Sequence, residues 1–349
     1  MKVLIRVNGR GNAWPLELGT PTNLRDAARR ESQDEYANTS LSLIGLQEEP
    51  PQTVSWEILF DVGQGVVPFL VRHNNRLPNA VILSHPHFDH IAGLDWLVAS
   101  HRRHRTSEQA LPVYTSKPCW DAVMRTFGYL QSALTLGELR PGEYCQIAEA
   151  PELWLKPFPV FHGDYAPGAC LMLVEYRPPA RPPVKAILTG DLLCPLLRQQ
   201  DYESLRNPAV VYVDANTRFP WPPSGHWSIL PRSAVFDDWR EGLHPSYLIT
   251  PHARSFEPVT HGFLDDFLHE QRHCHDLCWT IRDFVERVQP QKVQLVHYSG
   301  YEDQQYHGEA ILTDEQLLAW VERTVDRGGQ AGFWGVPQPG NIFTLDGSA

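Results

Sequence analysis

The chain has 349 residues, of which 42% are hydrophobic and 20% are charged, and its formal net charge at pH 7 is −11. This composition is typical of a globular protein, and no stretch approaches the ~20 consecutive apolar residues of a membrane span. The acidic balance disfavours a broad nucleic-acid-binding surface, because phosphate contacts depend on clustered lysines and arginines.

The cysteines and the first residues indicate a cytoplasmic protein. Residues 1–8 interrupt their apolar side chains too early for a secretion signal and are expected to form a strand. The six cysteines are scattered, so we expect them to be reduced thiols. Only Cys274 and Cys278, which flank a histidine, have spacing typical of a structural metal site. The sequence leaves that site open, because no second cysteine pair accompanies them.

The predicted secondary structure mixes strands and helices. Strands are expected at 3–7, 40–44, 55–60, 155–161, 169–176, 184–190, 210–213 and 292–296, and helices at 91–104, 118–131, 262–288 and 313–327. The proline-rich residues 177–183 predict a stiff hairpin tip. Residues 216–272 are rich in tryptophan and proline but have little periodicity. We expect them to form an insertion or lid within a single domain that spans residues 1–349.

The most informative segment is His85-Pro86-His87-Phe88-Asp89-His90, which follows an apolar run and precedes a helix-like segment. Alternate side chains of an extended chain share a side, so His85 and His87 can converge on one ion. Asp89 and His90 follow where the chain turns into a helix and can address a second ion. Imidazole suits zinc, and a carboxylate suits zinc, manganese or iron. The segment therefore predicts metal binding.

Later polar residues stand at the ends of predicted strands. His162, Asp191 and His297 each lie at or just beyond such an end, where α/β folds place their functional sites. A single histidine is usually a satisfied core residue, so only the ordered set indicates ligands. Asp61 and Asp214 have two readings, either as hydrogen-bond partners of metal ligands or as ordinary turn carboxylates.

The ordered set, together with Thr189-Gly190-Asp191, resembles the metallo-β-lactamase superfamily over nearly the whole chain. The resemblance implies an α/β fold, specifically a four-layer αββα sandwich, with two divalent metal ions at one edge. Zinc is the expected metal, with manganese or iron as alternatives. The implied ligands of one ion are His85, His87 and His162. Those of the other are Asp89, His90 and His297, and Asp191 would bridge both.

Residues 60–65 and 290–299 resemble the ribonuclease Z branch, which includes a phosphodiesterase that opens cyclic ribose phosphates. The resemblance implies a hydrolase in which a metal-bridging hydroxide attacks a small or cyclic phosphodiester, with Asp89 orienting the nucleophile or accepting its proton. That branch often carries a further histidine that faces the substrate phosphate. His226 fits by its neighbours and His275 by its spacing, and the sequence does not choose between them.

Other functions stay open at this stage. An RNA-processing nuclease would need a basic channel, whereas a lactone or thioester hydrolase would not share the surroundings of His162 and His297. A non-catalytic protein of the same fold is disfavoured by the complete ligand set. The expected partner is a small phosphodiester or nucleotide-like substrate, and neither a membrane nor extended nucleic acid is expected. The oligomeric state is not determined, and a homodimer is one option.

Overall fold

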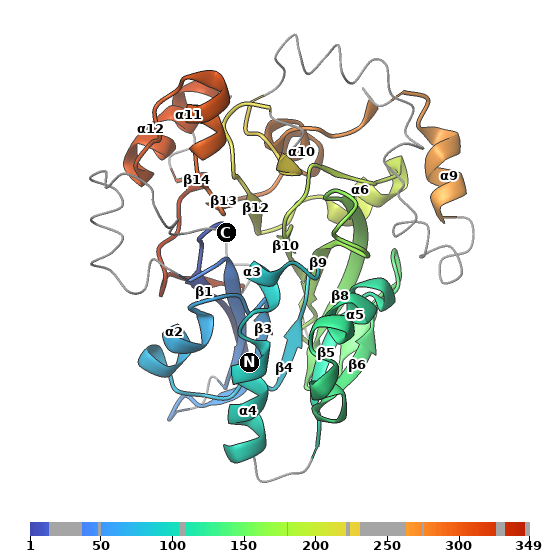
Figure 1. Ribbon diagram of the computed structural model, residues 1–349, viewed down its shortest axis with the longest axis vertical. Coiled ribbons are helices and arrows are strands. Elements are labelled where there is room, and N and C mark those ends of the chain that lie inside the picture. The colour runs from blue at the N-terminus through green and yellow to red at the C-terminus, as the bar shows by residue number, and fades with distance from the viewer. Residues whose placement is uncertain are drawn as a thin grey trace.

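A computed structural model describes residues 1–13, 37–47, 50–104, 109–179, 181–220, 224–230, 263–273, 276–325 and 332–345. These residues form two β-sheets with helices packed against them (Figure 1). Within the described ranges, every helix is too short or too polar to cross a membrane.

The first sheet is built mainly from the N-terminal part of the chain. Its strands lie in the order β15 (Ile342–Thr344), β1 (Lys2–Gly9), β2 (Ser40–Leu46), β3 (Val54–Phe60), β4 (Ala80–Ile82), β5 (Leu111–Thr115) and β6 (Leu134–Glu138). The pairs from β15 to β3 are antiparallel, and those from β3 to β6 are parallel. The carboxyl ends of β3, β4 and β5 therefore meet at one edge of the sheet.

The second sheet is built from the C-terminal part. Its strands lie in the order β11 (Cys194–Pro195), β8 (Ala150–Phe161), β9 (Cys170–Tyr176), β10 (Val184–Leu188), β12 (Val210–Asp214), β13 (Val293–Val296) and β14 (Trp334–Gly335), with β7 (Cys145–Ile147) paired to β8. The antiparallel pairing of β9 with β10 confirms the predicted hairpin. The strands β10, β12, β13 and β14 are parallel, so their carboxyl ends also share an edge.

Helices cover the outer face of each sheet. On the first sheet lie α2 (Val66–His73), α3 (Phe88–Ile91), α4 (Leu94–His104), α5 (Lys117–Thr126) and the 3₁₀ helix η2 (Gly128–Ala133). The helices in the part of the chain that forms the second sheet are α6 (Gln199–Leu205), α9 (Phe263–Glu270), α10 (Ile281–Val288), α11 (Tyr301–His307) and α12 (Asp314–Thr324). In Figure 1, α2 and α4 lie beside the blue strands, whereas α10, α11 and α12 lie beside the yellow-to-red strands.

The alternation of apolar side chains explains the layers. In β12, Val210 and Tyr212 belong to the core between the sheets, whereas Val211 and Val213 contact the helix layer. In β4, Ala80 and Ile82 face the other sheet and Val81 faces helices. Strands buried on both faces stabilise the sandwich, since each fully buried aliphatic side chain contributes about 1.5–3 kcal/mol. The predicted αββα fold class is confirmed.

One predicted helix is wrong. Within the predicted helix 262–288, the described residues form two helices, α9 and α10, rather than one. Thr280 has extended backbone angles, and its side-chain oxygen accepts a hydrogen bond from the Asp283 N–H, which makes it the N-cap of α10. A continuous helix cannot pass through a residue in that conformation.

The predicted insertion at 216–272 stays a prediction. Residues 216–220, 224–230 and 263–272 are described, and they contact the second sheet through Trp227 and Ile229, which are fully buried. Residues 231–262 lie outside the described residues, as do positions 221–223. Whether the segment is a lid within one domain is therefore not tested.

Candidate metal centre

The predicted ligands come together where the strand ends of the two sheets meet. The first sheet contributes the extended segment after β4, with His85 and His87, and then α3, with Asp89 and His90. Figure 1 shows α3 in the middle of the molecule, at the junction of the two halves. The second sheet contributes His162 just after β8, Asp191 after β10, and His297 directly after β13. Each half of the fold therefore carries part of the centre.

Three histidines form the first cluster. The ring centroids of His85, His87 and His162 lie 4.7 to 4.8 Å apart, and His162 Nε2 lies 3.1 Å from His87 Nδ1. The Nε2 atom of His85 is buried and has no hydrogen-bond partner among the described residues. Burial lowers the pKa of His162 to about 3 and holds that of His85 well below its ordinary value. Both imidazoles are therefore neutral, as metal ligation requires.

The second cluster joins two carboxylates to two histidines. His90 Nε2 lies 3.1 Å from Asp191 Oδ2 and 3.3 Å from Asp89 Oδ2. His297 Nε2 lies 3.3 Å from the same Asp191 atom and 3.6 Å from Asp89 Oδ2. Asp191 Oδ2 is also 3.8 Å from His85 Nε2 and from His162 Nε2. One oxygen of Asp191 therefore lies between the two clusters, in the position of a bridging ligand.

Two residues of the centre have unusual backbones. His297 and Asp61 have φ values of 65° and 54°, in the left-handed region that residues with a Cβ rarely adopt. Such a conformation costs on the order of 1–3 kcal/mol, and it persists only where neighbouring contacts impose it. The backbone N–H of His297 is held by the carbonyl of Arg10, at 2.9 Å. The strain coincides with functional candidates, which supports a functional reason for it.

Hydrogen bonds to the outer ring nitrogens direct the opposite nitrogens inward. Asp61 Oδ2 lies 2.8 Å from His90 Nδ1, and the Gly225 carbonyl oxygen lies 2.8 Å from His162 Nδ1. Ser84 Oγ lies 2.9 Å from His85 Nδ1 and itself donates to Asp61 Oδ2 at 2.7 Å. With Nδ1 protonated, the Nε2 lone pairs are free for metal. Asp61 is thus a hydrogen-bond partner of the predicted ligands, and Ser84 is a further partner that sequence reasoning missed.

The charge balance of the centre favours cations. Asp61, Asp89, Asp191 and Asp214 are buried, and among the described residues their ion-pair partners are all histidines. Burial lowers the pKa of His297, but the carboxylates of Asp191, Asp214 and Asp89 outweigh it and raise that pKa to about 10. The carboxylates likewise hold the pKa of His90 well above its ordinary value, against the effect of burial. Without metal, the excess negative charge of the aspartates thus favours protonated imidazoles at His90 and His297. Divalent cations would replace these protons.

The donor atoms therefore suit two metal ions. Those of His85, His87 and His162 lie within 4.8 Å of one another, as do those of Asp89, His90, Asp191 and His297. This spacing and the mixture of imidazole and carboxylate fit zinc, manganese or iron without distinguishing them. The assignment of each residue to a particular ion stays a prediction.

His226 lies beside both clusters. Its ring centroid is 4.9 Å from those of His162 and His297, and its Nδ1 lies 2.6 Å from Asp214 Oδ2. Asp214 is anchored by the backbone N–H groups of Leu192 and Asn216, each at 3.2 Å. The structure thus places His226 beside the predicted ligands, and its role toward a substrate stays a prediction. The competing candidate, His275, lies outside the described residues.

The proposed structural metal site at Cys274 and Cys278 is only partly visible. Cys278 is buried, its thiol donates to the Thr280 carbonyl oxygen at 3.6 Å, and burial raises its pKa. Cys274 lies outside the described residues, so the pair is not tested.

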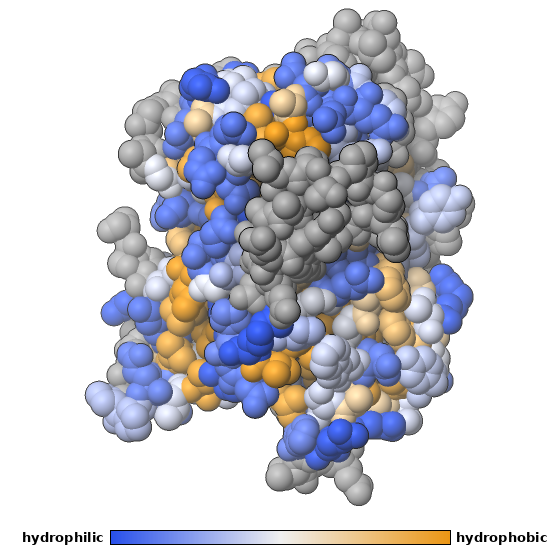
Figure 2. All heavy atoms as spheres, turned by 60° about the vertical axis from the view of Figure 1, so that its left-hand side comes forward, coloured by the Kyte–Doolittle hydropathy of each residue, from blue (hydrophilic) through white to orange (hydrophobic). Residues whose placement is uncertain are grey.

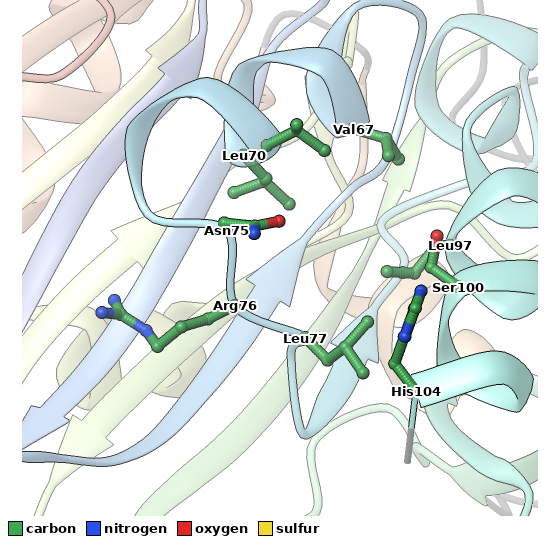
Figure 3. A pocket seen from close by; sticks show the side chains of 9 residues that line it. Val67, Leu70, Asn75, Arg76, Leu77, Leu97, Ser100 and His104 are labelled. Atoms are coloured by element: carbon green, nitrogen blue, oxygen red, sulfur yellow. The ribbon is translucent and has the colours of Figure 1, made fainter.

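A separate cavity of about 590 Å³ lies between α2 and α4. Figure 3 shows Val67 and Leu70 from α2 on one side and Leu97 and His104 from α4 on the other, with Arg76 extending away from them. None of its lining residues belongs to the metal centre. Figure 2 shows that apolar residues on one face of the molecule emerge in separate patches among hydrophilic ones.

Comparisons with known proteins agree with this architecture. A family model for a beta-lactamase superfamily domain matches residues 57–229. The structure of a diphosphatase from the PhnP family is similar, with a TM-score of 0.61, 14% identity, and coverage of 99% of this chain and 98% of that chain. YhfI from Bacillus subtilis, described as a metallo-beta-lactamase fold protein, has a TM-score of 0.58, 14% identity, and coverage of 99% and 100%. Human tRNase Z, short form, has a TM-score of 0.52, 12% identity, and coverage of 98% and 99%. No curated protein matches the sequence.

Proposed function

This chain is a metallo-β-lactamase-fold protein, and on that premise we propose that it is a dinuclear metal-dependent phosphodiesterase acting on a small or cyclic phosphodiester. Support for the reaction class comes from the two ligand clusters and from the similarity to a PhnP-family diphosphatase and to tRNase Z. Zinc is the proposed metal.

The observation that carries the proposal is the pair formed by His226 and Asp214. The Asp214 carboxylate is 1% exposed and lies 2.6 Å from His226 Nδ1, next to the clusters. Because Asp214 accepts the Nδ1 proton, the ring is fixed in orientation beside Asp191 and His297. A hydrolysed phosphodiester expels an alkoxide, which needs a proton as it leaves. An imidazole held beside the ligands, yet outside the two predicted ligand sets, suits that task.

The other residues of the centre have defined tasks in this reaction. Two divalent ions, when bound, would lower the pKa of water toward neutrality and neutralise charge on the phosphoryl oxygens. Asp89, which is 8% exposed, places one carboxylate oxygen among His90 and His297, where it can orient the nucleophile and accept its proton. His226 delivers a proton to the leaving oxygen, and Asp214 keeps the ring aligned. The buried surroundings strengthen each of these charge interactions.

The proposed substrate is a small anionic diester. The net charge of −11 opposes the binding of a long RNA, which supports a small substrate over an RNA-processing role. Lactones and thioesters carry no charge at the reacting group, so a centre with two cations and a histidine held by a carboxylate suits them less well. We propose no membrane partner, and a homodimer stays a prediction.

The test is hydrolysis of bis(p-nitrophenyl) phosphate and of 2′,3′-cyclic AMP by the metal-reconstituted protein. Chelated protein and Asp89→Asn should lose turnover of both substrates. His226→Ala should retain its metal but lose about 10²–10⁴-fold in kcat on the cyclic nucleotide, whose leaving alkoxide needs a proton. Its loss on the p-nitrophenyl diester should be much smaller, because p-nitrophenolate leaves unprotonated. Exposed His104, which lies in the separate cavity, supplies a matched His→Ala control.

Two results would contradict the proposal in different ways. If fully loaded protein hydrolyses a lactone or a thioester but neither diester, the phosphodiesterase proposal fails. Equal losses on both diesters in His226→Ala would retain the reaction class but reject His226 as the proton donor.

A further inference from the structure

A buried ion pair joins two segments that lead to the candidate metal centre. Arg218 and Asp303 are 2% and 0% exposed, and Arg218 Nε donates to Asp303 Oδ2 at 3.0 Å. Asp303, on α11, also accepts the backbone N–H groups of Arg218 and Phe219, at 3.0 and 3.2 Å. Arg218 Nη2 donates to the Ala310 carbonyl oxygen at 2.6 Å. One carboxylate thus fixes two successive peptide groups as well as a guanidinium.

The pair connects the segments that carry three residues of the centre. Arg218 follows Asp214 by four residues, and its carbonyl oxygen accepts the N–H of Leu230, at 2.9 Å, from the segment that holds His226. Asp303 belongs to the segment that follows His297. The Asn216 carbonyl oxygen joins the two segments by accepting the N–H groups of Ser299 and Gly300, at 3.3 and 3.2 Å.

Stability alone is a weak reason for such a pair, because replacing a buried ion pair with apolar residues of similar size is often neutral. The hydrogen bonds to the backbone define a geometry instead. His297 has a left-handed backbone that its surroundings must impose. We propose that Arg218 and Asp303 are positioning residues, which act by holding the segments of Asp214, His226 and His297 in register. This inference relies on the proposed two-ion centre.

The expected consequence is unequal for the two ions. His297 belongs to the second cluster, whereas His85 and His87 are held from the other sheet. Substitution of the pair should therefore lower the affinity for the ion at Asp89, His90 and His297. The affinity for the ion at His85, His87 and His162 should change less. The loss should be about 10–100-fold in affinity, as for other residues that orient metal ligands. If the pair were merely structural, its substitution would change the thermal stability and leave the ratio of the two metal affinities unaltered.

The central experiment is stepwise zinc binding by Arg218→Met/Asp303→Leu, measured by competition with a chromophoric chelator. Two reference variants, His297→Ala and His87→Ala, show which binding step belongs to which ion. The double variant should resemble His297→Ala. Asp303→Asn and Asp303→Glu provide the same comparison if the double variant does not fold, because the first keeps the side-chain size and the second keeps the charge.

Glu57→Gln is the matched control. Glu57 is 1% exposed, pairs with Arg6 at 2.6 Å, and lies on β3 in the first sheet, which carries none of Asp214, His226 and His297. This variant should lose stability and bind both ions normally. The inference is overturned if the Arg218/Asp303 variants bind both ions like the wild type, or if Glu57→Gln weakens the second ion equally. A wild-type protein that binds two ions but hydrolyses no phosphodiester would remove the proposed function and leave this inference standing.

Discussion

Asp61 should control both metal ions from a position where it touches neither. It is fully buried, and Asp61 Oδ1 accepts the Ser84 N–H at 2.8 Å. Asp61 Oδ2 accepts the Ser84 hydroxyl at 2.7 Å and lies 2.8 Å from His90 Nδ1. Ser84 Oγ in turn lies 2.9 Å from His85 Nδ1. One carboxylate therefore orients a ligand of each cluster, His90 directly and His85 through Ser84.

Asp61→Asn keeps the volume of the side chain but removes its charge and one acceptor. The amide has one acceptor oxygen, so either the Ser84 N–H or both the Ser84 hydroxyl and His90 Nδ1 lose their acceptor. A hydrogen bond to a charged group is worth about 1.5–3 kcal/mol. Since 1.4 kcal/mol corresponds to a tenfold change in affinity, we expect each ion to bind about 10–100-fold more weakly.

Chelator competition with the folded variant measures both affinities. Ser84→Ala should lower chiefly the affinity for the ion at His85. This variant therefore separates the effect of Ser84 on His85 from the direct effect of Asp61 on His90. Asp201→Asn is the control, because Asp201 is a buried carboxylate that caps α6. If Asp61→Asn binds both ions within twofold of the wild type, the assigned orientation of His85 and His90 is refuted.

Three further perturbations test metal binding and the stability of the fold. Removing metal should lower the melting temperature in calorimetry, because an ion at 100 times its Kd contributes about 2.7 kcal/mol to stability, and an unchanged value would argue against tight binding. Gly63→Ala should cost about 1–3 kcal/mol in urea denaturation, since its Cβ would clash with the Asp89 carbonyl oxygen, and a neutral effect would contradict that close contact. Thr313→Ala should cost about 1 kcal/mol in the same assay, because Thr313 caps α12 and its side chain accepts the Gln316 N–H, whereas exposed Thr126→Ala should change little.

The sequence was informative where geometry is local. His85 to His90 lie within six residues, so a strand followed by a helix is sufficient to bring their side chains together. The later candidates follow strand ends, and the carboxyl ends of parallel strands meet at one edge. Apolar runs predicted β1, β2, β3, β8, β9, β10, β12 and β13, because burial of a strand is a local pattern, whereas other strands such as β5 and β6 were not predicted. The αββα arrangement was expected from the resemblance to the metallo-β-lactamase superfamily, because strand patterns alone do not show how two sheets stack.

Long-range contacts explain what the sequence did not provide. Nothing local indicates that Asp214 would hold His226, because the two residues approach through the packing of a loop against β12. Ser84 was missed because a serine beside a histidine has no distinctive pattern. The break between α9 and α10 was missed although Thr280 and Asp283 carry a capping signal. The polar run from His269 to His273 also lies at the break, and the prediction of one helix overlooked it.

The division of the ligands between the sheets has a consequence for protein synthesis. A ribosome releases the segment with His85, His87, Asp89 and His90 long before His297, which follows β13 near the end of the chain. Domains fold as the chain emerges, N-terminal part first. The nascent first half exposes four potential ligands without their partners, and a metal ion held there has an incomplete shell. The complete set of predicted ligands would therefore form only after translation of β13, when His297 joins the other side chains.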